Sequence, residues 1–183
     1  MKGARASVEV QVAGLTIDPF TNMPIIVLRD AAGKHQVPIW IGLVEASAIA
    51  TQLEKIQLAR PMTHDLLKSL MDQVGATIDR VEVTELKGDT FYANIYVNAD
   101  GKGLVFDARP SDAIAMALRA NAKIYVSQDV IDQAELAEQK SDVRSGEKPD
   151  RSGPGSVLAG HPPSKWAEIL ASLSPEDFGK FKM

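Results

Sequence analysis

Two short polar segments carry the side chains best suited to acid–base chemistry and to binding an anion. The first, residues 60–65, reads Arg-Pro-Met-Thr-His-Asp at the start of a predicted helix. A carboxylate can fix the tautomer of an imidazole, so His64 beside Asp65 is a candidate general base in a helix turn whose free N–H groups attract anions. The alternative interpretation is structural: Thr63 caps the helix, Asp65 complements the helix dipole and His64 is a surface residue.

The second segment, residues 107–112, reads Asp-Ala-Arg-Pro-Ser-Asp and joins a predicted strand to a predicted helix. Ligand sites are common where a strand ends and a helix begins, because side-chain and backbone groups converge there. The candidate catalytic residues of this segment are Asp107, Arg109, Ser111 and Asp112. Alternatively, Asp112 caps the helix and Asp107 forms a structural ion pair with Arg109.

The carboxylates of the two segments bear on metal binding. Asp65, Asp107 and Asp112 would together repel a phosphate unless a divalent cation lay between them. If the site cleaves a phosphodiester, we therefore predict a cation such as Mg²⁺, with Asp107, Asp112 and Glu45 as its ligands. Glu45 begins another predicted helix and has the alternative role of matching that helix dipole. The sequence contains no phosphate-loop, dinucleotide-binding or zinc-protease motif, so we predict no residues that bind an organic cofactor.

The composition excludes several classes of protein. A chain of 183 residues with 45 % hydrophobic residues is typical of a globular protein with one substantial core. The absence of cysteine excludes disulfides, thiolate nucleophiles and cysteine-bound metals. No segment approaches the run of about 20 apolar residues that spans a membrane, and the N-terminus lacks a signal-peptide pattern, so we expect a cytoplasmic protein without a membrane partner. A net charge of −4 argues against strong non-specific binding to nucleic acid.

The hydrophobic periodicity predicts the elements that position these segments. Alternating patterns indicate two groups of strands: residues 7–15, 24–29 and 35–41 form the first, strands that begin near residues 77, 91 and 104 form the second, and a short strand follows at 124–126. Helical spacing indicates helices at 43–56, at 63–74 with Gly75 as its C-cap, at 110–120 and at 129–138. The predicted fold is α+β, with two antiparallel or mixed β-meanders packed with three to four helices and a C-terminal helical tail.

The chain divides into three parts by composition. Residues 1–137 form the predicted domain, and residues 138–163 are rich in polar residues, glycine and proline, which predicts a flexible linker. Residues 164–183 form the predicted helical tail, with one apolar face carrying Trp166, Ile169, Leu170 and Leu173. Because a lone helix of this length is marginal in water, we expect it to dock on this domain or on a partner.

Four motifs in the same order resemble the bifunctional nuclease family over roughly residues 7–137. They are Pro-Ile-Trp-Ile-Gly at 38–42 with Glu45, Arg-Pro-Met-Thr-His-Asp at 60–65, Phe-Tyr-Ala at 91–93 and Asp-Ala-Arg-Pro-Ser-Asp-Ala at 107–113. The resemblance implies an α+β domain that forms homo-oligomers, and nuclease activity toward DNA and RNA as in plant members. The candidate residues come from their chemistry at the positions of these motifs.

Two hypotheses of different classes remain. In the first, the chain is a nuclease in which His64 acts as base or acid, Arg109 steadies the phosphate, and the carboxylates bind metal or relay protons. In the second, it is a non-catalytic oligomeric binding or assembly module, in which the same residues form a structural ion network and the Trp166 helix is the docking element. The nuclease mechanism requires that His64 and residues 107–112 converge in space.

Overall fold

The computed structural model describes residues 6–144, with side chains up to Leu136, and these residues form an α+β fold as predicted. The strands are β1 (Ser7–Ile17), β2 (Pro24–Asp30), β3 (Gln36–Trp40), β4 (Thr77–Lys87), β5 (Thr90–Ala99), β6 (Lys102–Ala108) and β7 (Lys123–Ser127). The helices are α1 (Leu43–Leu53), α2 (Thr63–Gln73), α3 (Pro110–Ala120) and α4 (Gln128–Arg144). Within residues 6–144 no helix combines the length and apolar character needed to cross a membrane.

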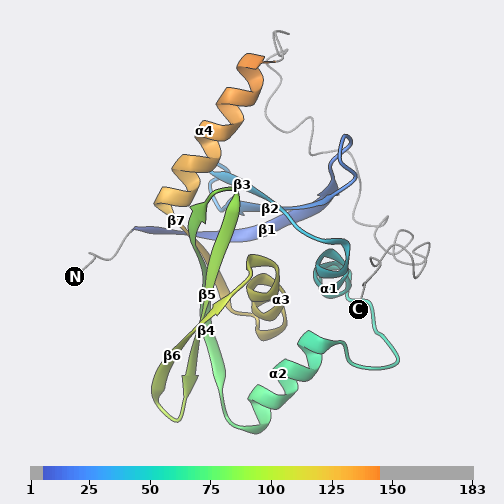
Figure 1. The fold of residues 1–183 in the computed structure, drawn as a ribbon. Coiled ribbons are helices and arrows are strands. Elements are labelled where there is room, and N and C mark those ends of the chain that lie inside the picture. Colours follow the sequence, from blue (N-terminus) through green and yellow to red (C-terminus); the bar gives the residue numbers. More distant parts are fainter. Residues whose placement is uncertain (1–5, 145–183) are drawn as a thin grey trace.

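All of these strands belong to one mixed sheet in the order β3-β2-β1-β7-β4-β5-β6. The two predicted meanders, β1–β2–β3 and β4–β5–β6, are both present and antiparallel. The short strand β7 lies between them, antiparallel to β1 and parallel to β4. The last strand of the domain therefore joins the two meanders into a single sheet, which runs nearly horizontally at β1–β2 and nearly vertically at β4–β5 in Figure 1.

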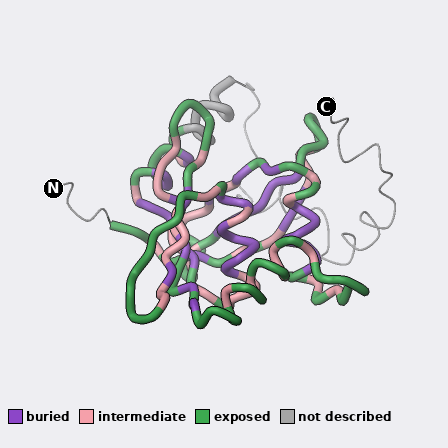
Figure 2. The backbone as a smooth tube through the Cα atoms, turned by 60° about the horizontal axis from the view of Figure 1, so that its bottom comes forward, coloured by how far each residue is buried: buried purple, intermediate pink, exposed green. Residues whose placement is uncertain are grey.

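The hydrophobic core lies between this sheet and three of the helices. Helix α3 packs on β4 and β5 and also contacts α1, which in turn contacts β2, while α4 contacts β3, β4 and β7. The centre of α3 carries fully buried Ile114 and Met116, and α4 contributes Val130 and Ile131. Figure 2 shows buried backbone concentrated in the middle of the molecule, whereas turns and outer segments are exposed.

The helix ends follow the sequence signals with one correction. Pro110 occupies the first position of α3, where its missing N–H is not needed, and Gly75 follows α2 with a φ of +70°. The predicted N-cap of α2, Thr63, is instead the first helical residue, and Met62 is the N-cap. The reason is that the Asp65 carboxylate accepts a hydrogen bond from the Met62 N–H at 2.8 Å and so closes the helix start.

Two predicted boundaries also move. Helix α1 ends at Leu53 rather than near residue 56, and Lys55 adopts a left-handed φ of 53° just after it. Helix α4 continues to Arg144, beyond the predicted end at Glu138, so the first residues of the predicted linker are helical. Residues 145–163 of that linker and the predicted tail at 164–183 lie outside the described residues.

Candidate active site

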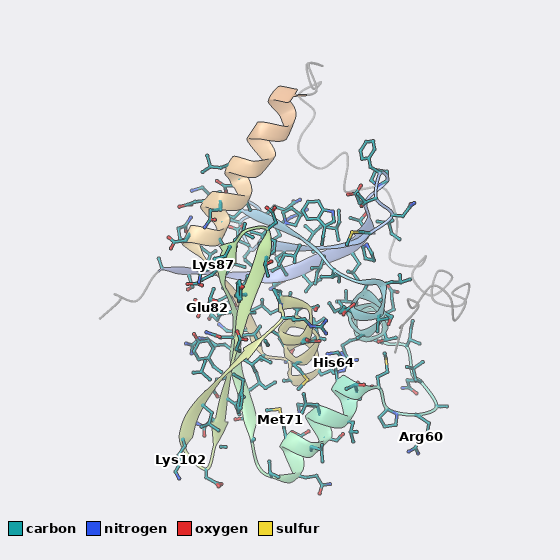
Figure 3. All side chains as sticks on the ribbon, in the orientation of Figure 1. Arg60, His64, Met71, Glu82, Lys87 and Lys102 are labelled. Carbon is teal, nitrogen blue, oxygen red and sulfur yellow. The ribbon has the colours of Figure 1, made fainter. Side chains whose placement is uncertain are left out.

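His64 and Asp112 meet although they are far apart in the sequence. His64 lies in the first turn of α2, Asp112 lies in the first turn of α3, and the two helices contact each other (Figure 3). The His64 Nε2 atom is 3.2 Å from Asp112 Oδ1. If Nε2 carries the proton, Asp112 accepts it as a hydrogen bond and Nδ1 is left as a proton acceptor. This is the arrangement that orients a histidine for general base chemistry.

Arg109 connects this pair to a second carboxylate. Its Nε donates to Asp112 Oδ2 at 2.7 Å, and its Nη2 donates to Asp112 Oδ1 at 3.2 Å, which is a bidentate pairing. Its Nη1 donates to Glu45 Oε1 at 2.8 Å. Arg109 precedes α3 as its N-cap residue, and its side chain is 65 % exposed. The guanidinium is therefore both held by carboxylates and open to solvent.

Glu45 reaches Arg109 from the first turn of α1. The residue that precedes this helix is Gly42, and a Cβ atom built there would collide with the Glu45 carboxylate. Glycine at position 42 thus leaves room for Glu45 to turn back over the helix start. The predicted metal ligand Glu45 does lie in the cluster, and in this structure its carboxylate pairs with an arginine. We call Glu45, His64, Arg109 and Asp112 the His64 cluster.

The charges of the His64 cluster support one another. Partial burial acts to raise the pKa of Asp112, but the hydrogen bonds from Arg109 and His64 outweigh it, and the pKa of this carboxyl lies below its usual range. The hydrogen bond to Asp112 and the nearby negative charge raise the pKa of Arg109 further above its normal value. Asp112 is therefore ionised at neutral pH, as required of a group that orients a histidine.

Asp65 belongs to a different network, although it follows His64 in the chain. Its Oδ1 accepts a hydrogen bond from Arg119 Nε at 2.6 Å, and its Oδ2 accepts one from the Met62 N–H. Arg119 is 5 % exposed and also donates to the carbonyl oxygens of Ala48 and Ala115. Burial acts to raise the pKa of Asp65, but the bonds from Met62 and Arg119 lower it overall. We call Asp65 and Arg119 the Asp65 pair.

Asp107 and Ser111 do not join the His64 cluster. Asp107 pairs in register with Asn94, whereas its neighbours Phe106 and Ala108 pair with Ile95 and Ala93, which face the core. Because side chains alternate along a strand, Asp107 points away from the face on which α3 packs. Ser111 lies in the first turn of α3, but it is buried. Of the six predicted catalytic residues, the structure brings together His64, Arg109 and Asp112.

Comparison with known protein families decides what kind of domain carries this cluster. The model of the bifunctional nuclease domain matches residues 26–139, which is more than half of the chain. The chain belongs to the bifunctional nuclease domain family. The match contains every residue of the His64 cluster and the Asp65 pair.

Relatives of this bifunctional nuclease domain fall into two groups. A protein of Mycobacterium tuberculosis strain H37Rv, whose name assigns no function, is 36 % identical over 172 residues, covering 93 % of this chain and 97 % of its own. Bifunctional nuclease 1 of Arabidopsis thaliana is 29 % identical over 108 residues, and bifunctional nuclease 1 of Oryza sativa subsp. japonica is 25 % identical over 124 residues. These alignments cover 57 % and 60 % of this chain but only 33 % and 38 % of the plant proteins.

In this bifunctional nuclease domain, the three predicted metal ligands do not form a coordination site. They are Glu45, Asp107 and Asp112. Among residues 6–144 no group of three histidine or acidic side chains is placed to hold an ion. Glu45 and Asp112 lie near each other, but the Arg109 guanidinium bonds to both of them, and Asp107 faces the other side of the sheet. A cation that used Glu45 and Asp112 would require Arg109 to leave this position.

Arg119 is the important residue that the sequence reasoning missed. It is a single cation in the otherwise apolar end of α3, and such a residue must find an acidic partner if it is buried. That signal is visible in the sequence, but it does not identify Asp65 as the partner. A pocket of about 290 Å³ borders the pair, and its lining includes neither His64, Arg109 nor Asp112. It is lined by Thr51, Gln52, Ile56, Leu58, Arg60, Pro61, Asp65 and Arg119.

Proposed function

We propose that this chain is a nuclease that hydrolyses phosphodiester bonds in DNA and RNA at the His64 cluster. The observation that carries the proposal is the meeting of His64 and Asp112, from the first turns of two helices, beside the exposed guanidinium of Arg109. Family membership and the plant relatives named as bifunctional nucleases support the substrate class.

The proposed reaction uses His64 as the base. Nδ1 of His64 takes a proton from an attacking water while Asp112 holds the proton on Nε2 and stabilises the resulting imidazolium. Water oxygen forms a bond to phosphorus, the bond from phosphorus to the leaving ribose or deoxyribose oxygen breaks, and that oxygen takes a proton from solvent. Arg109 exchanges one carboxylate partner for a phosphate oxygen, since a planar guanidinium suits either anion.

A divalent cation is the second part of the proposal. Such an ion would lower the repulsion between the site carboxylates and the phosphate and would help to generate the attacking hydroxide. Glu45 is the carboxylate of the His64 cluster that this exchange would free to ligate it, while Asp112 stays bonded to Arg109 and His64. We propose no role for Asp107 at this site because of the face on which it lies.

The test compares two histidines in purified full-length protein. His64→Ala is measured on single-stranded DNA and on RNA, with Mg²⁺, with Mn²⁺ and with EDTA, and is expected to cleave about 10²–10⁴-fold more slowly than the wild type. His35→Ala is the matched control, because His35 also pairs with a carboxylate, its Nδ1 lying 2.9 Å from Glu135 Oε1, and both imidazoles are 17 % exposed. That control is expected to keep wild-type activity.

Two results would contradict the proposal in different ways. Equal cleavage by His64→Ala and the wild type would contradict the assignment of the active site to His64, but not the nuclease activity. Absence of cleavage by the wild type under all of these conditions would remove the nuclease itself. It would favour a binding module, for which the pairing of Arg109 with two carboxylates is the supporting observation, since it is also what a structural ion network requires.

A further inference from the structure

The pocket beside the Asp65 pair has no part in the proposed reaction. It has a volume of about 290 Å³ and lies among the end of α1, the connection from α1 to α2, the start of α2 and the end of α3. Its wall is mixed, because Ile56, Leu58 and Pro61 of the connection are apolar and the remaining lining residues are polar. Apolar walls with a few convergent polar groups are the usual form of a ligand site.

The charged side chains of this pocket favour an anion. Arg60 and Arg119 are cations and Asp65 is an anion, so the lining carries one net positive charge on a chain whose net charge is −4. Both oxygens of the Asp65 carboxylate already accept hydrogen bonds, from Arg119 and from the Met62 N–H. The groups that remain available to a ligand are therefore mainly donors, and phosphate oxygens are acceptors that suit them.

Arg119 supplies a buried donor to the pocket. Its side chain is only 5 % exposed, and its Nε and Nη1 donate to Asp65 and to two backbone carbonyls. Its Nη2 makes no hydrogen bond within the described part of the chain. Because no fully buried side-chain nitrogen or oxygen among these residues lacks a partner, Nη2 must reach accessible space, and Arg119 borders this pocket. A ligand oxygen in the pocket would satisfy that donor.

Two exposed side chains add donors at the same pocket. Arg60 and Gln52 make no side-chain hydrogen bond or ion pair with other described residues. Figure 3 shows Arg60 on the connection that leads into α2, the helix that carries His64. A guanidinium without a carboxylate partner binds a phosphate without first giving up another bond.

The pocket lies close to the His64 cluster along α1 and α3, which contact each other. Gln52 follows Glu45 by about two turns of α1, and Arg119 follows Asp112 by about two turns of α3, which is about 10 Å along each helix. The first turn of α2 contributes one residue to each site. A single strand covers about 10 Å within about three nucleotides, even at the ~3.4 Å spacing of stacked bases.

We propose that this pocket binds a nucleotide of the substrate strand near the phosphodiester held at the His64 cluster. A phosphate of that nucleotide accepts hydrogen bonds from Arg60 and from Nη2 of Arg119, and its sugar and base pack on the apolar wall. The side-chain amide of Gln52 offers the base both a donor and an acceptor. The volume is near the lower end of the range for ligand sites, about 300–1,000 Å³, which suits one nucleotide. This inference rests on the proposed nuclease function, which supplies the strand.

The first experiment measures equilibrium binding of full-length protein to labelled single-stranded DNA and RNA oligonucleotides by fluorescence anisotropy in EDTA. Arg60→Ala and Gln52→Glu are each expected to raise Kd by about tenfold, because each removes or opposes a charge-assisted phosphate contact. Arg29→Ala is the matched control and should keep Kd within about twofold of the wild type. Arg29 is exposed on β2, where it bonds to Gln36, and its loss changes the net charge by the same amount.

Two further measurements separate a phosphate contact from a structural effect. The slope of log Kd against log salt concentration should decrease by about 0.7 in Arg60→Ala, the value for one lost phosphate contact to a single strand, and stay unchanged in Arg29→Ala. In cleavage assays Arg60→Ala should raise KM by about tenfold and leave kcat unchanged, because a contact away from the scissile bond stabilises bound substrate and transition state equally. His64→Ala should lower kcat instead.

Several results would overturn this inference. They are a wild type that does not bind the oligonucleotides, an unchanged Kd in both pocket variants, and an equal loss in Arg29→Ala, which would reflect net charge alone. A free 5′-mononucleotide that binds as tightly as the oligonucleotide, with the same dependence on Arg60, would also overturn it, because the pocket would then serve a separate ligand.

The nuclease proposal fails by different results. If the pocket variants weaken binding but the wild type does not cleave, the pocket is supported as a site for a strand and only the reaction is contradicted. If cleavage depends on His64 but KM is unchanged in Arg60→Ala, only the role of the pocket is contradicted.

Discussion

The His64 cluster and the Asp65 pair start from consecutive residues of one helix turn, but they have opposite properties. Asp65 turns toward Arg119, whose guanidinium is almost fully buried and also bonds to two backbone carbonyls. His64 turns toward Asp112 and Arg109, where the guanidinium remains mostly exposed. The first network can hold α1, α2 and α3 together, and the second can exchange a partner for a ligand. His64 and Asp65 are therefore neighbours in the sequence but do not pair with each other.

The largest expected difference between the two networks is in stability. Asp65→Ala leaves a buried cation without its carboxylate, and because the Asp65 side chain itself is 36 % exposed the expected cost is about 2–3 kcal/mol, below that of breaking a fully buried pair. Asp112→Ala removes the partner of an exposed arginine and should cost about 1 kcal/mol or less. Urea denaturation followed by circular dichroism measures both. At a temperature where both variants are folded, Asp112→Ala should have the lower nuclease activity, so the order of the two effects reverses. If one variant were the more impaired in both stability and activity, the distinction between a structural Asp65 pair and a functional His64 cluster would be contradicted.

Replacing Arg109 by lysine tests how the His64 cluster works. A lysine ammonium cannot form the bidentate bond to Asp112 and reach Glu45 at the same time. We expect Arg109→Lys to lower kcat/KM for cleavage by about tenfold, a loss of roughly 1.4 kcal/mol of transition-state binding. Lys68→Arg is the control, because Lys68 pairs with Asp72 within helix α2 and outside the His64 cluster, and it should leave kcat/KM unchanged. Unchanged kinetics in Arg109→Lys would show that the guanidinium has no part in the reaction.

The Asp65 pair should also produce a pH dependence of stability. The pKa of Asp65 in the folded protein lies below the value of 3.8 expected for the unfolded chain. The pair therefore contributes its full stability well above pH 3.8, and this contribution is lost as the pH falls toward 3.8 and then through the lower folded-state pKa. In Asp65→Asn the free energy of unfolding should be lower at neutral pH and should fall less steeply in that acid range. If the free energy of unfolding fell equally steeply with pH in the wild type and in Asp65→Asn, the stabilising role of ionised Asp65 would be contradicted.

Much of the fold follows from local patterns in the sequence. The two meanders, the helix that begins with Pro110 and the glycine after α2 are set by alternation, by proline geometry and by positive φ, which act within a few residues. The insertion of β7 between β1 and β4 does not follow from such patterns, because it depends on the packing of residues that are distant in the chain. Helical spacing predicts α2 at residues 63–74, but the sequence does not indicate that the rest of the described domain buries none of its residues.

The site was predictable to a similar degree. Residue types and helix starts indicated His64, Arg109 and Asp112, since first turns of helices are where such groups converge. The partner choice was not predictable: Asp112 rather than Asp65 pairs with His64, because α2 meets α3 with His64 on the contacting side. The closeness of Asp107 to Arg109 in the sequence predicts that both belong to one site. The register of β6 with β5 instead places the Asp107 side chain on the face of the sheet opposite α3, and the sequence alone does not give that register.

The smallest expected effect is that of Asp107→Asn, and it is the direct test of this placement. Asp107 is exposed on β6 and faces away from α3, so its charge has no contact with His64, Arg109 or Asp112 among the described side chains. We expect cleavage rates within about twofold of the wild type and a free energy of unfolding within about 0.5 kcal/mol of it. Asp112→Asn, which changes a carboxylate of the His64 cluster in the same way, is the matched variant and should reduce cleavage strongly. Because the two substitutions are chemically identical, a comparable loss in both would mean that β6 turns Asp107 toward the substrate and that the site extends across the sheet edge.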